Sequence, residues 1–465
     1  MGFSRGSILS ICSPNVPEYC SVFFGALASG GTVSPVNPTY TAGELAYQFE
    51  NSATDMIATV PALLPTVQKA AEKVGVKKII AIGREGESCN RSSNLIAYDH
   101  LLEDSGSAFN QVFVDAKQDI AVLPYSSGTT GLPKGVMVTH YNITTNILQL
   151  GHSELLYLHK EGTTLLGVLP FFHMYGMVTV LFSSLYAGSK VVSLSKFEPE
   201  LFLNAITKFK TELVHVVPPL ILFLAKHPTV VNYDLSCIRQ ITAGAAPLGR
   251  ELVETARSRL KCDVIRQVYG LTESGCVHMA PASLSKEKPQ SVGVPIKSMD
   301  VKVVDPETNE ALSAGEEGEV LIRGPNIMKG YLNLPDATRS CITGDGWFRT
   351  GDIGHFDKDG WFYITDRLKE LIKVKGLQVA PAELEALLVT HEKIADAAVV
   401  GVTDERLGEA PRAYVVKDDC SLQEREVEEY IARRVAKHKH LVGGVQFVDA
   451  IPKSASGKIL RRLLK

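Results

Sequence analysis

Between about Thr163 and Gly270, hydrophobic and polar positions follow one rhythm. Short apolar runs such as TTLLGVLP and ELVHVVPP alternate with amphipathic stretches such as residues 199–209 and 249–260. Buried strands that alternate with helices are typical of βαβ units, so the pattern predicts a largely parallel sheet covered by helices. In such sheets, ligands bind beyond the carboxyl ends of the strands.

After Pro295 the rhythm changes to short strands separated by turns. Asp-Lys-Asp-Gly at residues 357–360 is typical of a hairpin turn, and we expect strands at residues 301–304, 318–323 and 361–365. Beyond residue 366 the pattern predicts a separate α+β unit, with helices at residues 380–390 and 422–437 and strands at residues 397–402, 413–416 and 445–448.

A glycine-rich loop, YSSGTTGLPKGV at residues 125–136, follows the apolar run at residues 120–124. Its glycines permit backbone conformations that a Cβ forbids, so successive amides can converge on an anion. Hydroxyl groups and one lysine add further donors, and the loop therefore predicts a phosphate-binding site. The Walker motif is excluded because Lys134 is followed by Gly135 and not by Ser or Thr.

Composition narrows the class of protein. The chain has 465 residues, 45% hydrophobic and 21% charged, which suffices for at least two hydrophobic cores, and its net charge of −3 gives no reason to expect a nucleic-acid partner. The eight cysteines show no CxxC pair and no metal-ligand spacing, so we expect reduced thiols, no disulfide, no zinc and an intracellular location. No apolar run approaches the roughly 20 residues of a membrane span, and we expect no integral membrane association.

The loop resembles the phosphate-binding signature of the adenylate-forming superfamily, which includes acyl-CoA synthetases, 4-coumarate–CoA ligases, firefly luciferases and the adenylation domains of peptide synthetases. Three further segments resemble the same family in the same order. They are YGLTES at residues 269–274, the stretch from TGDIG to APAELE at residues 350–385, and PKSASGKILRR at residues 452–462. Four ordered matches over most of the chain are more specific than any one alone.

The resemblance implies an α/β fold with a large N-terminal domain, residues 1–365, made of parallel α/β subdomains and a small β-barrel. A hinge at Asp366 and Lys369 would join it to a small, mobile α+β C-terminal domain, residues 366–465. Residues 7–29 resemble an internal strand and helix of the large domain, so we expect that the family's usual opening segment is missing. The C-terminal Leu-Leu-Lys is not the peroxisomal Ser-Lys-Leu address, which leaves the cytoplasm and the organelles open.

Adenylation joins a carboxylate to the α-phosphate of ATP while pyrophosphate leaves, and it requires cations and oriented donors around the growing charge. By resemblance, Lys134 and the loop hydroxyls hold the β- and γ-phosphates, Thr272 contacts the α-phosphate, and Glu273 holds Mg²⁺. Asp352 and Arg367 would bind the ribose hydroxyls. The implied ATP- or AMP-binding set is Ser126, Ser127, Gly128, Thr129, Thr130, Gly131, Lys134, Gly244, Ala245, Ala246, Pro247, Gln267, Val268, Tyr269, Gly270, Thr272, Asp352, Ile364, Arg367 and Lys458.

Lys458, in the SASGK turn, would bridge the acyl carboxylate and the α-phosphate in the first half-reaction. The small domain would then rotate about the hinge and bring a second face to the site, with Lys373 as a catalytic residue on it. The implied CoA-binding set is Lys373, Lys375, Gly376, Leu377 and Gln378.

The segment LPFFHMYGM resembles the family's route to the acyl carboxylate, which makes His173 a catalytic candidate. The implied acyl pocket comprises His173, Tyr175, Ala245, Val268 and Ser274. Val268 stands where a Gly is usual, QVYG rather than QGYG, so we expect a narrowed tunnel and an acyl group smaller than 4-coumarate or differently angled.

Each candidate has a simpler interpretation when its motif is taken alone. Thr272 with Glu273 is then a helix cap followed by a first-turn acid, and Asp352 with Arg367 is a surface ion pair. A single His on an apolar segment, such as His173, is more often a core residue than a catalyst.

The sequence therefore predicts an ATP-dependent, AMP-forming acid–CoA ligase of fatty acid or phenylpropanoid metabolism, with ATP, Mg²⁺ and coenzyme A as cofactors. The substrate would be a small-molecule carboxylic acid, either 4-coumarate-like or a medium- or long-chain acyl group, and we expect a monomer or a weak dimer. A luciferase-like monooxygenase shares every motif, a carrier-loading adenylation protein shares the first step, and a non-catalytic truncated homologue is a further alternative.

Overall fold

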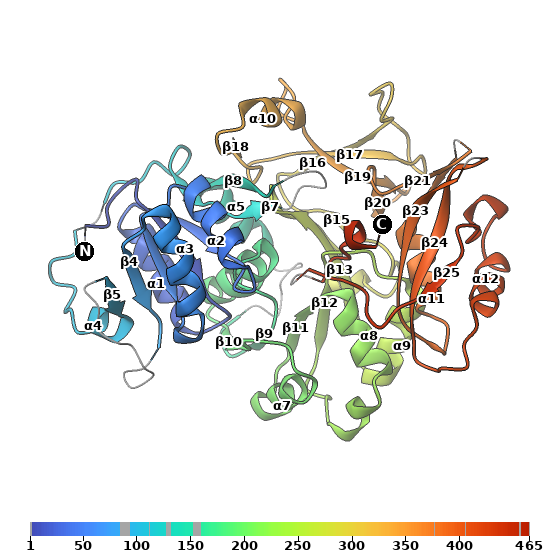
Figure 1. The fold of residues 1–465 in the computed structure, drawn as a ribbon, viewed down its shortest axis with the longest axis horizontal. Helices are drawn as coiled ribbons and strands as arrows, with labels where there is room; N and C mark the ends of the chain where they lie inside the picture. The colour runs from blue at the N-terminus through green and yellow to red at the C-terminus, as the bar shows by residue number, and fades with distance from the viewer. Residues whose placement is uncertain are drawn as a thin grey trace. The chain divides into compact units, whose positions relative to one another are not determined.

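The computed structural model describes residues 2–83, 94–110, 112–126, 132–151, 160–375, 377–404, 406–454 and 457–464 of the chain (Figure 1). The chain folds as two units, each assembled from segments that are separate in the sequence. Unit 1 comprises Met1–Glu212, Gly270–Cys276 and Gly324–Gly346. Unit 2 comprises Leu213–Tyr269, Val277–Arg323 and Trp347–Lys465.

Unit 1 is built on a nine-stranded sheet with the order β18-β8-β6-β2-β1-β3-β4-β5, in which β7 pairs with β8. The pairs from β6 to β5 are parallel, whereas β8 runs antiparallel to β6, β7 and β18. All four residues of β3 are buried, as expected for a strand covered on both faces. The strands span Ile8–Cys12 (β1), Thr32–Val36 (β2), Met56–Thr59 (β3), Lys78–Ala81 (β4), Leu95–Ala97 (β5), Ile120–Val122 (β6), Tyr125–Ser126 (β7), Lys134–Thr139 (β8) and Gly330–Tyr331 (β18).

Two helices of unit 1 begin at threonines that cap them. α2 (Ala42–Asn51) follows Thr41, and α5 (His140–Leu150) follows Thr139. Each threonine hydroxyl accepts from the backbone N–H of the residue three positions later, and the side chain of that residue accepts from the backbone N–H of the threonine. The other helical segments are α1 (Glu18–Ala28), η1 (Pro61–Leu63), α3 (Leu64–Val74), α4 (Tyr98–Leu102), η2 (Tyr175–Phe182), α6 (Ser183–Tyr186), α7 (Pro199–Phe209) and α10 (Pro335–Cys341). A parallel pair, β9 (Thr164–Gly167) and β10 (Lys190–Ser193), completes the unit.

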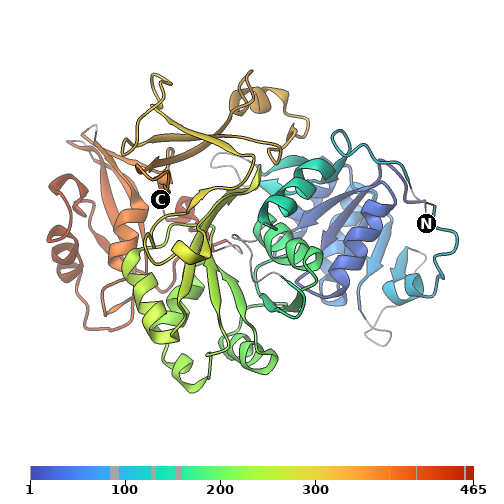
Figure 2. The same cartoon turned by 180° about the vertical axis from the view of Figure 1, so that it is seen from behind.

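Unit 2 has three parts, and the first is the predicted parallel sheet. Strands β11, β12 and β13 pair in parallel, and helices α8 and α9 lie side by side next to them (Figures 1 and 2). β14 and β15 form an antiparallel pair. The elements span Leu213–Val216 (β11), Pro218–Lys226 (α8), Pro228–Asn232 (η3), Gln240–Ala243 (β12), Arg250–Leu260 (α9), Val264–Leu271 (β13), Gly275–Met279 (β14), Ala282–Leu284 (η4) and Val294–Pro295 (β15).

The second part is a four-stranded antiparallel sheet with the order β16-β17-β19-β20. The predicted hairpin turn joins its last two strands: the Asp357 carboxylate accepts from the amides of Asp359 and Trp361, and Gly360 has a φ of +79°, which favours glycine. The strands span Asp300–Val304 (β16), Gly318–Arg323 (β17), Phe348–Phe356 (β19) and Phe362–Arg367 (β20).

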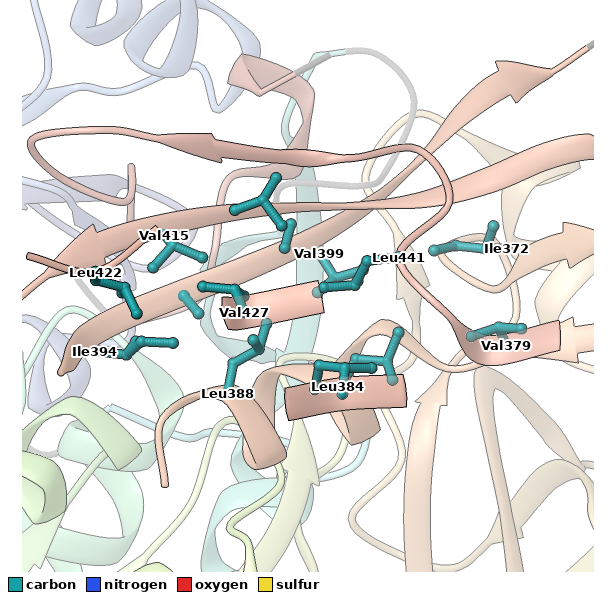
Figure 3. Close-up of a cluster of buried hydrophobic side chains, with 14 of the residues drawn as sticks. Ile372, Val379, Leu384, Leu388, Ile394, Val399, Val415, Leu422, Val427 and Leu441 are labelled. Carbon is teal, nitrogen blue, oxygen red and sulfur yellow. The ribbon is translucent and has the colours of Figure 1, made fainter. Parts of the chain in front are cut away.

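The third part is a five-stranded sheet, β22-β21-β24-β23 with β25 beside β24, together with two helices. Figure 3 shows the apolar side chains of these elements gathered into one cluster, which includes Leu384 and Leu388 of α11 and Val399 of β23. The elements span Ile372–Val374 (β21), Leu377–Val379 (β22), Pro381–Leu388 (α11), Ile394–Asp404 (β23), Gly408–Lys417 (β24), Glu424–Ala432 (α12), Lys437–Lys439 (η5), Val445–Phe447 (β25) and Arg461–Leu463 (η6).

The predicted fold class is confirmed, and most predicted elements are present with shifted ends. The helix predicted at residues 422–437 is shorter, since α12 ends at Ala432, and β19 and the β21–β22 hairpin were not predicted. β19 has several polar or glycine positions, which obscure the alternation of apolar and polar residues expected for a strand. β21 and β22 have three residues each, which is too short to show such an alternation. None of the helices in the described ranges combines the length and the apolar character that a bilayer crossing requires.

Candidate functional site

Strand pairing holds together the two ends of the predicted phosphate-binding loop. Ser126 in β7 lies opposite Lys134 in β8, and Tyr125 lies opposite Gly135. The Tyr125 hydroxyl also donates to Oδ1 of Asn51 in α2 at 2.7 Å. The described residues thus fix both stems of the loop. Its remaining predicted ligands lie outside the described residues: Ser127, Gly128, Thr129, Thr130 and Gly131.

A cluster of Lys134, Tyr331 and Glu273 lies at the base of the loop in unit 1. The Lys134 Nζ is 5.0 Å from the centroid of the Tyr331 ring, and the Tyr331 hydroxyl donates to Oε1 of Glu273 at 2.9 Å. One hydroxyl bond leaves a carboxylate with lone pairs for a hard cation, so this residue fits the predicted magnesium ligand. Tyr331 was missed by the sequence analysis, because a tyrosine on a two-residue strand gives no pattern.

A cavity of about 40 Å³ in unit 1 brings His173 and Thr272 together. A cavity needs roughly 10–15 Å³ to hold one water molecule, so this cavity can admit a small polar group. Its other lining residues are Pro35, Asn37, Tyr40, Gln48, Pro124, Tyr125, Phe172 and Met174.

The loop that carries His173 is held by a buried asparagine. The side-chain amide of Asn15 donates to the backbone oxygens of Gly167 and Leu169, and its oxygen accepts from the amide of Phe171 at 2.8 Å. His173 is half-buried, and its Nδ1 accepts from the amide of Tyr175 at 3.3 Å. Asn15 therefore fixes where the candidate histidine lies, and nothing in its sequence context indicated that role.

Asp352, Tyr269 and Arg367 form one cluster in unit 2. The Tyr269 hydroxyl donates to Oδ2 of Asp352 at 2.6 Å, and Nε of Arg367 lies 3.0 Å from Oδ1. The Asp352 side chain is only 5% exposed, so the pair is not the surface ion pair that the residues alone suggest. Burial, followed by the charge of Asp352, raises the pKa of Tyr269 well above its usual range, so the hydroxyl stays a donor.

The turn after β12 carries four more predicted nucleotide ligands. Gly244 is buried, Ala245 has a φ of +75°, and Ala246 and Pro247 are exposed. Gln267 is 3% exposed and uses its amide to hold this turn, accepting from the amide of Leu248 and donating to its oxygen and to the oxygen of Pro289. The structure thus assigns Gln267 a scaffolding contact. Val268 in β13 is buried, and Ile364 in β20 is half-buried.

The YGLTES segment continues from β13 into a tight turn in unit 1. At Gly270 a Cβ would lie 2.1 Å from the backbone oxygen of Gly275, so no other residue fits without backbone movement. Ser274 is buried, and its hydroxyl accepts from the amide of Leu271 at 3.4 Å and donates to the oxygen of Gly275 at 3.0 Å. Thr272 and Glu273 lie in this turn and not at a helix start, which removes the helix-cap interpretation.

The predicted CoA-binding residues lie on the β21–β22 hairpin. Lys373 is paired with Gln378 across it, Lys375 at the turn has a φ of +51°, and Leu377 is 52% exposed. Gly376 lies outside the described residues.

At the predicted hinge, Lys369 is exposed, whereas Asp366 is buried. The carboxylate of Asp366 accepts from the amides of Arg367 and Ala382, and its burial raises its pKa. The Asp366 bonds therefore join β20 to the start of α11.

The predicted catalytic Lys458 follows Gly457 near the end of the chain. Its backbone oxygen accepts from the amide of Ser454.

Comparisons with known proteins identify the class. The sequence pattern of the AMP-binding enzyme family matches residues 1–332, and that of the AMP-binding enzyme C-terminal domain matches residues 383–458. A probable 4-coumarate–CoA ligase 1 of Dictyostelium discoideum is 41% identical over 100% of this chain and 86% of its own length. A 4-coumarate–CoA ligase 2 of Petroselinum crispum is 41% identical over 100% of this chain and 85% of its own.

Solved structures agree with the sequence relatives. ATP-bound MatB from Rhodopseudomonas palustris superposes with a TM-score of 0.87 at 27% identity, over 100% of this chain and 89% of that chain. The o-succinylbenzoate CoA synthetase of Bacillus subtilis, in complex with an acyl-adenylate, gives a TM-score of 0.82 at 27% identity, over 99% of this chain and 88% of that chain.

The fold and the relatives together define the class as adenylate-forming enzymes. The chain belongs to the AMP-binding enzyme family. The predicted superfamily and the predicted enzyme class, an AMP-forming acid–CoA ligase, are therefore confirmed.

Proposed function

We propose that this protein joins one organic acid to AMP, using ATP, and then transfers the acyl group to the thiol of coenzyme A. The observation that carries the proposal is the 41% identity to 4-coumarate–CoA ligases over the whole chain. No observation favours a luciferase-like monooxygenase or a carrier-loading protein, so both serve as outcomes of the test below.

In this proposal the loop base and the unit 1 cluster handle the triphosphate. Ser126 and Lys134 would donate to the β- and γ-phosphates, Thr272 would contact the α-phosphate, and Glu273 would hold Mg²⁺, which would offset the charge of the phosphates. A dication that bridges phosphates usually takes only one or two protein carboxylates, which is consistent with this assignment. Tyr331 would orient the Glu273 carboxylate through its 2.9 Å hydrogen bond.

The nucleoside would bind at the cluster of Asp352, Tyr269 and Arg367. A carboxylate can accept from both hydroxyls of a vicinal diol, and the Arg367 guanidinium adds donors. The adenine would lie between the turn at residues 244–247 and the strand at residues 267–270.

The second half of the proposal concerns the C-terminal segment. Residues 1–365 and 366–465 would act as the two domains, with Asp366 and Lys369 as the hinge. Lys458 would bridge the carboxylate and the α-phosphate in the first step. Rotation would then bring the β21–β22 hairpin to the site, where Lys373, Lys375, Gly376, Leu377 and Gln378 would contact coenzyme A.

For the substrate, we propose a medium-chain acid in place of a bulky aromatic acid. Val268 is buried in β13 next to Tyr269, and its branched side chain takes space that the glycine of the resembled QGYG pattern would leave open. His173, Tyr175, Ala245 and Ser274 would form the other walls. One extra or missing methylene in an apolar pocket is worth about 1–3 kcal/mol of discrimination, so one side chain can set this preference.

A panel of acids tests both levels of the proposal. We expect CoA-dependent release of AMP, with higher kcat/KM for C6–C10 acids than for 4-coumarate, and we expect V268G to shift the ratio toward 4-coumarate by about tenfold. Faster turnover of 4-coumarate by the unaltered chain would contradict the substrate proposal. AMP release without any CoA dependence, or light emission with luciferin and ATP, would contradict the ligase proposal.

We also propose an intracellular location and a monomeric or weakly dimeric state. The seven cysteines among the described residues are free thiols, in keeping with a reducing compartment. Analytical ultracentrifugation across micromolar concentrations checks the assembly state, and a stable tetramer would contradict it.

A further inference from the structure

Lys458 lies on one of two stems that pair antiparallel as a short hairpin, with Lys453 opposite Ile459. The amide of Leu460 donates to the oxygen of Pro452, and the amide of Ser454 donates to the oxygen of Lys458, both at 2.8 Å. Isolated hairpins are marginally stable in water, so the position of this one depends on what anchors its stems.

The stem that enters the turn is held by Ile451, which is buried in an apolar cluster with Ala398 and Val400, and by one ion pair. Nζ of Lys453 pairs with Oδ2 of Asp396 in β23 at 2.5 Å, and the two side chains are 20% and 26% exposed. Both side chains are half-buried, and the pair holds the stem through a single lysine contact, which fixes a distance more than a direction.

The stem that leaves the turn has a strong anchor, Arg461. Its guanidinium is 15% exposed and uses all three nitrogens: Nη2 donates to both carboxylate oxygens of Glu385 at 2.8 Å, Nη1 to Glu370 at 2.6 Å, and Nε to the backbone oxygen of Val399 at 3.2 Å. A planar guanidinium that donates to three partners fixes direction as well as distance, which a lysine cannot do.

The residues that contact Arg461 lie in α11, in β23 and next to the predicted hinge. Glu385 lies in α11, and its Oε1 also accepts from the amide of Val399 in β23. Glu370 follows the predicted hinge, and the hinge carboxylate of Asp366 interacts electrostatically with Arg461. One guanidinium thus connects the hairpin, α11, β23 and the hinge.

α11 in turn lies against α8 and α9. Nζ of Lys226 at the end of α8 donates to the oxygen of Val389 at 2.6 Å, and a Cβ on Gly249 would lie 3.2 Å from the Cβ of Ala386. The hairpin tip reaches the same region, because a Cβ on Gly457 would lie 3.0 Å from Val217. The residues on the two sides of Lys458 are therefore both held: Gly457 lies close to Val217, and Arg461 is bonded to α11.

We propose that Arg461 is a positioning residue that holds the hairpin bearing Lys458 in register with α11 and the hinge, and so serves the adenylation half-reaction. The inference rests on the proposed function for the role of Lys458. It predicts that loosening Arg461 harms the step that needs Lys458 and spares the step in which that residue is withdrawn. Misplacement of a reacting group by about 1 Å can cost on the order of a hundredfold in rate.

The test compares R461K with R462Q. R461K keeps the charge and the aliphatic stem but loses the fork, and Arg462 is the exposed next residue. Adenylation is measured as acid-dependent ATP–pyrophosphate exchange, and thioester formation as CoA-dependent consumption of pre-made acyl-adenylate. We expect R461K to lower the kcat of exchange by about ten- to a hundredfold and to change thioester formation by less than about threefold, with R462Q within about twofold in both.

Hydrogen exchange provides a readout that does not depend on activity. In R461K the amides of Ser454 and Leu460 should exchange at least about tenfold faster, while core amides such as Val427 should keep their rates. An equal fall in both half-reactions, or unchanged exchange at Ser454 and Leu460, would overturn the inference. If R461K does not fold, E370Q removes one partner only and should shift both readouts in the same direction; no shift in either would overturn it.

The two proposals fail in different ways. If the unaltered chain shows no pyrophosphate exchange with any acid, the proposed function fails, and the hydrogen-exchange result still decides whether Arg461 holds the hairpin. If the unaltered chain is active and R461K loses both half-reactions equally, only the inference about Arg461 fails.

Discussion

Replacing Tyr269 with phenylalanine removes one hydroxyl from a buried, charged hydrogen bond. The hydroxyl is 2.6 Å from Oδ2 of Asp352, whose side chain is 5% exposed, so water has little access to replace it. A hydrogen bond to a charged group contributes about 1.5–3 kcal/mol. Arg367 remains on the other carboxylate oxygen and is 37% exposed, which places the expected loss near the middle of this range, at about 2 kcal/mol.

A second tyrosine that donates to an aspartate, Tyr363 in β20, offers a matched control. The hydroxyl of Tyr363 donates to Oδ2 of Asp357 at 3.2 Å, but that carboxylate is 28% exposed and keeps Lys288 at 2.7 Å. We expect Y363F to cost at most about 0.5 kcal/mol. Both tyrosines lose only a hydroxyl, so the difference between the variants isolates the buried bond.

Urea unfolding of both variants measures the loss in the free energy of unfolding, and the KM for ATP in pyrophosphate exchange measures the functional effect. If Asp352 holds the ribose, Y269F should raise the KM for ATP by up to about thirtyfold, since about 2 kcal/mol is lost and each 1.4 kcal/mol corresponds to tenfold, and Y363F should leave it unchanged. Equal unfolding free energies for Y269F and Y363F would refute the reasoning from burial. A changed stability with an unchanged KM for ATP would refute the assignment of Asp352 to the ribose.

Y331F should raise the magnesium concentration needed for half-maximal pyrophosphate exchange by about threefold, because Glu273 loses its orienting donor; an unchanged magnesium midpoint would contradict this. G270A should cost about 3 kcal/mol or more, since its Cβ would meet a backbone oxygen at 2.1 Å, whereas G43A, with nothing nearer than 3.9 Å, should be neutral or stabilising in urea unfolding. Burial, opposed by the charge of Arg461, raises the pKa of Glu385 from 4.5 to about 7, so the contribution of this group to stability is lost as the pH rises through that range; E385Q should lose less stability than the unaltered chain, and an equal loss in both would contradict it.

Most of the fold and the candidate site could be predicted from local patterns and from the long family motifs. The apolar rhythm and the hairpin turn at residues 357–360 predict structure because burial and turn chemistry act locally. The family resemblance brought together residues as distant as Tyr269 and Asp352, and in the structure they share a hydrogen bond. No periodicity in the sequence places these two residues in contact.

The contacts that the sequence did not reveal are single side chains that hold others in place. Asn15, Tyr331 and Arg461 each act across long sequence separations, through hydrogen bonds that depend on the folded chain. The nucleotide contact of Gln267 stays a prediction, and the structure adds a contact that the motif did not reveal, between its amide and the backbone of Leu248 and Pro289. Propensity and pattern describe local segments, and such bonds depend on tertiary geometry.

The central claim is that two steps share one site, in which an acid is first joined to AMP and then handed to sulfur. The direct measurement is product analysis by mass spectrometry after mixing the protein with ATP, Mg²⁺ and an accepted acid, first without and then with coenzyme A. The account predicts enzyme-bound acyl-adenylate and pyrophosphate in the first mixture, and acyl-CoA with an equal amount of AMP in the second. Formation of ADP, or an acyl-CoA that forms with no acyl-adenylate in the first mixture, would contradict it.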